Sequence, residues 1–233
     1  MNNRHKLLLW DIDGTLVIYK DKYPHRLFEG MIEAFFNKKI SLQNYRFSGK
    51  TDKAIIADMI GIAGISDEEH RAKEEAMMEW VADRVEEETS PDSFNLLPNV
   101  TQLLQKLSTA PNTTQALLTG NLPRCAEIKL RHFDLMKYFA FGAYGVESIN
   151  RNDLGPIALQ KFALHHDGNL PKDFQPIIIG DTIPDILCAQ HIGARCIITL
   201  TGRTVREEVE PYNPDYIFDD LSDTDKVLEA IYS

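Results

Sequence analysis

The chain has 233 residues, and its 35 acidic against 25 basic side chains give a formal net charge of −10 at pH 7. This excess of acidic groups argues against broad binding to nucleic acid or to an anionic membrane, since both need a basic face. Hydrophobic residues make up 43% and charged residues 26% of the chain. That composition excludes disorder as the main state and fits one large globular domain or a core with one insertion.

The sequence also limits where the protein works. No apolar run approaches the roughly 18–20 residues of a membrane span, and the apolar stretch near the start stops at Asp11, too short for a secretory signal. The three cysteines, Cys125, Cys188 and Cys196, are odd in number and form no C-x-x-C pair. We therefore expect neither a disulfide framework nor a thiolate metal site, and we expect a reduced, cytoplasmic protein. A monomer and a homodimer both fit the sequence.

Short apolar runs that are continuous rather than alternating are typical of parallel strands buried on both faces. Such runs lie at residues 7–10, 116–118, 177–179, 196–200 and 216–218. Apolar residues at helical spacing lie between them, at 100–107, 123–138 and 155–165. Strands that alternate with helices predict an α/β fold with a Rossmann-like parallel sheet.

Residues 19–91 have a different pattern, with no convincing strand and three helical stretches. The first two are 25–36 and 52–62, and the third is a long, strongly charged helix at 67–88 with a solvated face. In a compact fold, this region is best explained as an inserted α-helical cap subdomain. We expect residues 1–18 and 92–233 to form the core, and residues 19–91 to form the cap.

Two carboxylates follow the first apolar run, in the sequence D-I-D-G-T at residues 11–15. In a strand that continued this far, Asp11 and Asp13 would point to the same side, at the sheet edge where ligands bind in α/β folds. Carboxylates this close repel each other unless one is protonated or a cation lies between them, and oxygen ligands suit Mg²⁺. Gly14 permits a tight turn here. Taken alone, the motif also fits a strand followed by an Asx-type turn.

Two further apolar runs end in polar residues of related kinds. The run at 177–179 is followed by Gly-Asp, with Asp185 four residues after Asp181 and early in the next helix. The run at 116–118 is followed by Thr119, Gly120 and Asn121, and we expect Asn121 to cap a helix that starts at Pro123. A hydroxyl beside the amides of a helix N-terminus can bind an anion.

The order of these motifs resembles that of haloacid dehalogenase (HAD) superfamily hydrolases, in the phosphoglycolate phosphatase-like branch with an α-helical cap. That superfamily has D-x-D-G-T after its first strand, Ser or Thr at the end of a second, and G-D-x-x-x-D after a later one. This chain has residues 11–15, Thr119 and residues 180–185 in these places, and the insertion lies between the first two motifs. The resemblance covers essentially the whole chain. The combination of the three motifs is specific for this superfamily, although no single motif is.

The resemblance implies a Mg²⁺-dependent phosphatase that hydrolyses a small-molecule phosphate monoester. Asp11 would be the nucleophile, and Asp13 the general acid and then the general base. The metal would be held by Asp11, Asp181 and the backbone carbonyl of Asp13, while Asp185 would bind it through water or orient the cluster. Thr119 would hold phosphate oxygens. The residues Gly14, Thr15, Gly120 and Asn121 are the expected core contacts to the substrate.

The third motif departs from the family pattern. The superfamily has a Lys there, often followed by Pro, and this chain has no Lys-Pro pair in that window. Arg151 is our candidate for the missing catalytic cation, because a guanidinium can also neutralise a carboxylate and a phosphate oxygen. Lys161 is the alternative, although it falls inside a helical pattern and is expected at the surface.

The cap supplies further candidates. Residues 47–52, F-S-G-K-T-D, resemble the glycine-containing cap loop that reaches the active site in this superfamily. Gly49, Lys50 and Arg46 are the expected substrate contacts, with solvated cap-surface cations as the competing interpretation of the last two. His25, in the first cap helix, is a further candidate contact.

Other functions share parts of this pattern. A dehalogenase needs no acid at Asp13, because a halide leaves unprotonated. A β-phosphoglucomutase-like phosphomutase shares every motif used here. An enzyme that cleaves phosphonates would use a Schiff-base lysine in the cap, and Lys50 or Lys53 could be mistaken for such a residue. A non-catalytic ligand-binding module on the same fold would be expected to have lost Asp11 or Asp13.

Overall fold

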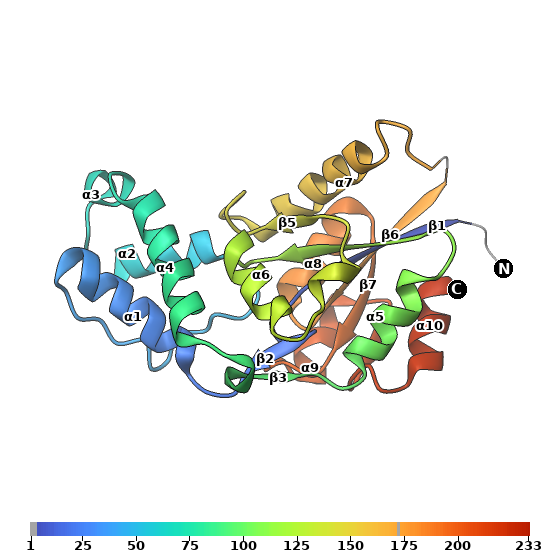
Figure 1. The fold of residues 1–233 in the computed structure, drawn as a ribbon, viewed down its shortest axis with the longest axis horizontal. Helices are drawn as coiled ribbons and strands as arrows, with labels where there is room; N and C mark the ends of the chain where they lie inside the picture. Colours follow the sequence, from blue (N-terminus) through green and yellow to red (C-terminus); the bar gives the residue numbers. More distant parts are fainter. Residues whose placement is uncertain (1–3, 172) are drawn as a thin grey trace.

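The computed structural model describes residues 4–171 and 173–233, and its centre is one parallel β-sheet (Figure 1). In the described part of the chain the sheet has six strands, in the order β5-β4-β1-β6-β7-β8. Their bounds are β1 His5–Trp10, β4 Thr113–Thr119, β5 Gly142–Tyr144, β6 Phe174–Gly180, β7 Arg195–Thr199 and β8 Tyr216–Phe218. The predicted α/β fold with a parallel sheet is therefore confirmed.

Helices cover both faces of this sheet, which explains why its strands read as continuous apolar runs. Leu8 and Trp10 of β1 pack on one face with residues of α5 Val100–Ser108, α6 Pro123–Arg131 and α10 Thr224–Tyr232. Leu7 and Leu9 pack on the other face with α7 Leu154–His165 and α8 Ile183–Ile192. Successive β1 side chains alternate between these two cores, as a pleated strand requires.

A four-helix segment, which we define as residues 23–88, lies to one side of the sheet (Figure 1). Its helices are α1 Tyr23–Phe36, α2 Asp52–Ile62, α3 Asp67–Arg71 and α4 Glu74–Glu88. They enclose an apolar core of their own, which includes Met31, Met59 and Met77. Cys125 and Ile128 of α6 belong to the same cluster, so one sheet-covering helix also packs against the four-helix segment.

Two short strands, neither of them predicted from the sequence, connect this segment with the sheet. β2 Val17–Tyr19 pairs antiparallel with β3 Phe94–Leu96, so the chain leaves and returns through a two-stranded ribbon. Three residues are too few to give a strand periodicity. The pairing is set by tertiary contacts, such as the rings of Tyr19 and Phe94, whose centroids lie 4.4 Å apart.

Two predicted helices were too long. The expected helix at 67–88 is two helices, because the backbone of Lys73 leaves the helical region while its ammonium donates to the Phe35 carbonyl at 2.9 Å. The expected helix at 123–138 ends at Arg131, and Asp134 adopts a left-handed conformation, with φ of 55°.

The remaining elements are short. They are the 3₁₀ turns η1 Pro91–Ser93, η2 Met136–Tyr138, η3 Arg151–Asp153 and η4 Glu210–Tyr212, and the helix α9 Arg206–Val209. Within the described residues, no helix combines the length and apolarity needed to cross a bilayer.

Candidate active site

Polar side chains from three neighbouring strands meet at the carboxyl end of the sheet. β1 lies between β4 and β6, and Asp11 and Asp13 follow it directly. Asp181 follows β6, and Thr119 is the last residue of β4. Because parallel strands end at the same edge, residues far apart in the sequence are brought together here.

Two of these carboxylates, with Asp185 from the first turn of α8, form a buried acidic cluster. Asp11, Asp181 and Asp185 each offer an oxygen atom, and these atoms all lie within 4.8 Å of one another. Burial raises the pKa of Asp11 to about 6, and burial with the neighbouring Asp11 carboxylate raises the pKa of Asp181 well above its usual value. Gly14 and Gly202 lie so close to Asp181 that an added Cβ would overlap its carboxylate. The carboxylate is thus held in place by backbone on two sides.

Arg151 is the basic residue that contacts this cluster among the described residues. One of its terminal nitrogens lies 3.1 Å from Asp11 Oδ1 and 2.5 Å from Asp185 Oδ1. The other oxygen of Asp185 accepts hydrogen bonds from the Thr182 amide at 3.0 Å and the Thr182 hydroxyl at 2.6 Å. Both carboxylate oxygens of Asp185 therefore have protein partners, in a position that suits orientation of the cluster.

The donor set fits a hard divalent cation. One guanidinium offsets a single charge of the three carboxylates. Among the described residues, Asp11 has no second ion-pair partner, and Asp181 is in neither of the ion pairs that Arg151 makes. Buried carboxylates in excess of their cations are stable when protonated or when a metal ion lies between them. Oxygen ligands of this kind suit Mg²⁺, and Asp11, Asp181 and Asp185 could hold such an ion.

Arg151 reaches the cluster from η3, at the start of the segment that leads into α7, and its side chain is buried. This is the position that the sequence suggested for the third-motif cation. Lys161, the alternative, donates to the Gly142 carbonyl at 2.6 Å and pairs with Glu147 at 2.8 Å. Its ammonium therefore has other partners, and the acidic cluster is not one of them.

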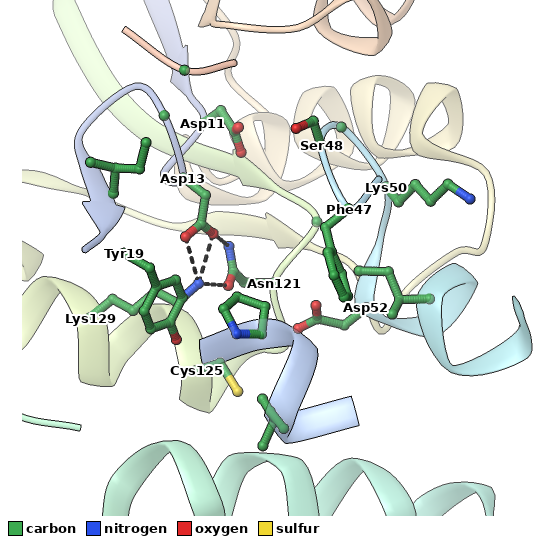
Figure 2. Close-up of a pocket in the computed structure, with 18 of the residues that line it drawn as sticks. Asp11, Asp13, Tyr19, Phe47, Ser48, Lys50, Asp52, Asn121, Cys125 and Lys129 are labelled. Carbon is green, nitrogen blue, oxygen red and sulfur yellow. Dashed lines mark hydrogen bonds and ion pairs between the residues drawn. The ribbon is translucent and has the colours of Figure 1, made fainter. Parts of the chain in front are cut away.

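Asp13 is held apart from the acidic cluster by Lys129, a residue that the sequence analysis missed. The Lys129 ammonium donates to both carboxylate oxygens of Asp13, at 2.8 and 2.7 Å, and to Asn121 Oδ1 at 2.6 Å (Figure 2). Its side chain is only 6% exposed and lies over the Tyr19 ring. Lys129 lies four residues after Cys125, and therefore on the same buried face of α6. That spacing was the sequence feature that could have indicated a buried lysine.

The strand end at Thr119 is arranged differently from our expectation. Asn121 does not cap α6, whose N-cap residue is Leu122. The side-chain amide of Asn121 instead donates to Asp13 Oδ2 at 2.7 Å and to the Thr119 hydroxyl at 2.8 Å. Thr119 is completely buried, and Thr15 is buried with its hydroxyl 3.5 Å from Asp181 Oδ1. Asn121 thus links the second motif to Asp13.

The loop at residues 47–52 contacts the sheet end, as its resemblance to a cap loop implied. Gly49 has φ of +74° and lies against Pro184, where an added Cβ would overlap the proline ring. The Asp52 amide donates to the Gly120 carbonyl at 2.7 Å, and the Asp52 carboxylate accepts from the Leu122 amide at 2.7 Å. Asp52 therefore satisfies an amide at the start of α6 that Asn121 leaves open.

The two cations that the sequence analysis assigned to the expected cap, Lys50 and Arg46, differ in position. Lys50 lines the pocket, but its ammonium lies 2.5 Å from Asp58 and over the Tyr45 ring, and points away from Asp13 (Figure 2). Arg46 is exposed and lies outside the lining residues. His25 lines the pocket and is buried against the Phe47 ring.

Comparison with known families agrees with this geometry. The model of the haloacid dehalogenase-like hydrolase family matches residues 8–190, and a second, HAD-hydrolase-like model matches residues 157–224. The first match covers most of the chain and includes all three motifs. The protein is a hydrolase by this match, and the chain belongs to the haloacid dehalogenase-like family.

The chain has low sequence identity to individual relatives. The chain is 24% identical to a phosphoglycolate phosphatase of Vibrio parahaemolyticus, over 97% of this chain and 96% of the relative. It is 26% identical to phosphoglycolate phosphatase 1 of Pseudomonas aeruginosa, over 94% and 78%. Among solved structures, a hydrolase from Pseudomonas syringae superposes with a TM-score of 0.69 at 20% identity, over 99% of this chain and 100% of that chain. CbbY from Rhodobacter sphaeroides superposes with a TM-score of 0.68 at 19% identity, over 94% and 96%.

Proposed function

We propose that this protein is a phosphatase that hydrolyses a small-molecule phosphate monoester through an aspartyl-phosphate on Asp11. The observation that carries the proposal is the separation of two carboxylates at the end of one strand. Asp11 belongs to the buried acidic cluster, whereas Asp13 is held by Lys129 and Asn121. Two carboxylates with different partners can take different roles in one reaction.

In the first step, an oxygen of Asp11 attacks phosphorus while the bond from phosphorus to the alcohol oxygen breaks. The alcohol oxygen takes a proton from the carboxyl group of Asp13 as it leaves. In the second step, water attacks the phosphorus of the aspartyl-phosphate and gives its proton to Asp13. Phosphate departs and the Asp11 carboxylate is restored.

A divalent cation, which we propose to be Mg²⁺, would supply charge neutralisation between the Asp11 carboxylate and the phosphate dianion. Asp11, Asp181 and the backbone carbonyl of Asp13 would hold it, and Asp185 would orient the cluster. Arg151 would take the place of the family's third-motif lysine, because its guanidinium contacts Asp11 and Asp185. Thr119, Gly120 and Asn121 would bind phosphate oxygens.

We also propose that residues 19–91 form a cap over the site, on a core made of residues 1–18 and 92–233. Support comes from the loop at 47–52, whose Asp52 bonds to Gly120 and Leu122 of the core. A cap that closes over the site would exclude water while phosphorus is attacked. A cytoplasmic location is supported by the three cysteines, which are free and buried.

The test is phosphate release from p-nitrophenyl phosphate and a panel of phosphate esters, in Mg²⁺ and in EDTA. We expect release that depends on the metal and falls at least about 1000-fold in Asp11→Asn. Asp225→Asn is the matched control, because its carboxylate is 97% exposed on α10. A folded wild-type protein that releases no phosphate with Mg²⁺ from any ester would refute the proposal. A sugar phosphate that is isomerised without release would favour the phosphomutase.

A further inference from the structure

The pocket extends from the acidic cluster into the four-helix segment, and its far part is largely apolar. The segment contributes Leu27, Phe28, Phe47, Ile55, Val81 and Val85 to the lining. Cys125 of α6 adds a thiol whose pKa is raised well above its usual value by burial. Figure 2 shows Asp52 and Cys125 beyond Asp13 and Asn121, as seen from Asp11. A phosphate bound at Asp11 would direct its alcohol part into this apolar space.

The basic side chains along the pocket already have acidic partners. Arg151 pairs with Asp11 and Asp185, and Lys129 pairs with Asp13. Lys50 lines the pocket, but its ammonium pairs with Asp58 and points away from Asp13. None of these three is free to neutralise a second negative charge on a substrate.

The two other basic groups of the lining are poorly suited to that task. His25 is buried, and burial lowers the pKa of its imidazole, so the ring is neutral at neutral pH. Arg203 is exposed, so water and salt screen its charge. A carboxylate in the apolar part of the pocket would therefore lack a buried cation.

Asp52 makes this part of the pocket unfavourable for anions. Asp52 is half-buried among the lining residues, and its carboxylate is fixed by the Leu122 amide at 2.7 Å. Burial raises its pKa to about 6, which leaves the group mainly ionised at pH 7 and above. Lys129 already offsets the charges of both Asp13 and Asp52, so it has no charge left for a substrate group. Burying a substrate carboxylate close to Asp52, without a further cation, is therefore unfavourable.

We infer that the preferred substrate is a phosphate monoester of an uncharged, apolar alcohol, and not of an anionic one such as glycolate. This inference rests on the proposed phosphatase function and concerns the leaving group alone. The inferred substrate therefore differs from phosphoglycolate, the compound in the names of the two phosphoglycolate phosphatase relatives.

Two esters of the same shape test the inference. Isobutyl phosphate and 2-phosphoglycolate are both esters of primary alcohols, and an isopropyl group in the first replaces the carboxylate of the second. We expect kcat/KM for isobutyl phosphate to be at least about tenfold higher, with Mg²⁺ at pH 7.5. Equal or better turnover of 2-phosphoglycolate would overturn the inference while leaving the phosphatase function intact.

Two substitutions locate the cause. Asp52→Asn keeps an acceptor for the Leu122 amide and removes the charge, so we expect about a threefold or greater rise in kcat/KM for 2-phosphoglycolate alone. A purely structural effect would instead lower kcat/KM for both esters. If Arg203→Gln lowers kcat/KM for 2-phosphoglycolate at least about tenfold without affecting isobutyl phosphate, then Arg203 binds the carboxylate and the inference is wrong.

Binding of inert analogues separates this inference from the proposed function. The phosphonates 3-methylbutylphosphonate and 3-phosphonopropionate replace the ester oxygen of the two substrates with a methylene group. We expect calorimetry with Mg²⁺ to give at least about tenfold tighter binding of the first, whether or not any ester is hydrolysed. Tighter binding of 3-phosphonopropionate would refute the inference, whereas failure of hydrolysis alone would refute only the phosphatase.

Discussion

The ammonium of Lys129 lies 2.7 Å from one carboxylate oxygen of Asp13 and 2.8 Å from the other. A third bond, to Asn121 Oδ1 at 2.6 Å, fixes the ammonium in turn. These contacts fix the position of the Asp13 side chain and keep its oxygens out of the acidic cluster around Asp11. Lys129 thus positions the group that we propose as acid and base, without itself reaching the proposed phosphate site.

Replacing Lys129 separates positioning from substrate binding. In Lys129→Met, Asp13 loses its main partner, and we expect kcat to fall about 10–100-fold with a much smaller change in KM. Lys129→Arg should recover part of kcat, because it restores the charge. The free energy of unfolding should fall by about 1–3 kcal/mol in the methionine variant.

Steady-state kinetics and denaturant unfolding measure these two effects. Lys39→Met, at a side chain that is 85% exposed, is the control for loss of a lysine. A rise in KM with unchanged kcat would contradict the positioning role and would place Lys129 in substrate binding.

Arg151 is the buried cation beside the acidic cluster, and its substitution tests whether it serves as the third-motif cation. Arg151→Gln leaves Asp11 and Asp185 without their cation, so we expect kcat to fall at least about 100-fold and stability without metal to fall by about 3–5 kcal/mol. Arg151→Lys restores the family's usual residue and should retain more activity than the glutamine variant.

Thermal unfolding with and without Mg²⁺ adds a second readout for Arg151. A divalent cation would offset part of the lost charge, so Mg²⁺ should raise the Tm of Arg151→Gln by more than it raises that of the wild type. If the glutamine variant keeps full activity, Arg151 has no role in the reaction.

The sequence predicts the sheet and the acidic cluster for the same reason. Continuous apolar runs identify buried parallel strands, and the residues that follow such strands lie at one edge, which is how Asp11 and Asp181 come together. Lys129 was missed because a buried charge in a helix has no sequence signature apart from its apolar neighbours. Its partners, Asp13 and Asn121, are distant in the chain and close only in the fold.

The errors in the helices have the same origin. The break at Lys73 depends on its bond to the Phe35 carbonyl, which belongs to another helix, and no local residue signals it. Likewise, Asn121 has a good N-cap side chain, but Asp13 and Thr119 are better placed to bind it. Tertiary partners override local preference at such positions.

Gly202 tests how closely Asp181 must be held. A methyl group at Gly202 would overlap the Asp181 carboxylate, so Gly202→Ala should displace it and raise the Mg²⁺ concentration for half-maximal activity about 10–100-fold. Gly61→Ala is the control, since nothing lies near that position in α2, and alanine there should stabilise the helix by up to about 1 kcal/mol. Unchanged metal dependence in Gly202→Ala would show that Asp181 does not bind the metal.

Asp181 itself connects the metal site with stability. Its pKa is raised in the folded protein, and an unfolded aspartate titrates near about 4. Above that pH the folded state binds a proton that the unfolded state has released, so the free energy of unfolding falls as pH rises. Asp181→Asn removes this penalty. In EDTA at pH 7.5 the variant should therefore be more stable than the wild type, by about 1–3 kcal/mol, and the difference should shrink towards pH 5.

Mg²⁺ reverses that order. It should stabilise the wild type at pH 7.5 and have little effect on Asp181→Asn, which should also lose activity at least about 100-fold. Urea unfolding at the two pH values, with EDTA and with Mg²⁺, measures all four conditions, and Asp225→Asn controls for the loss of an acidic group. A variant that is less stable than the wild type in EDTA, by the same amount at both pH values, would mean that Asp181 stabilises the fold by hydrogen bonding. In that case, charge repulsion within the acidic cluster would not destabilise the fold, and a metal ion would not be needed to offset it.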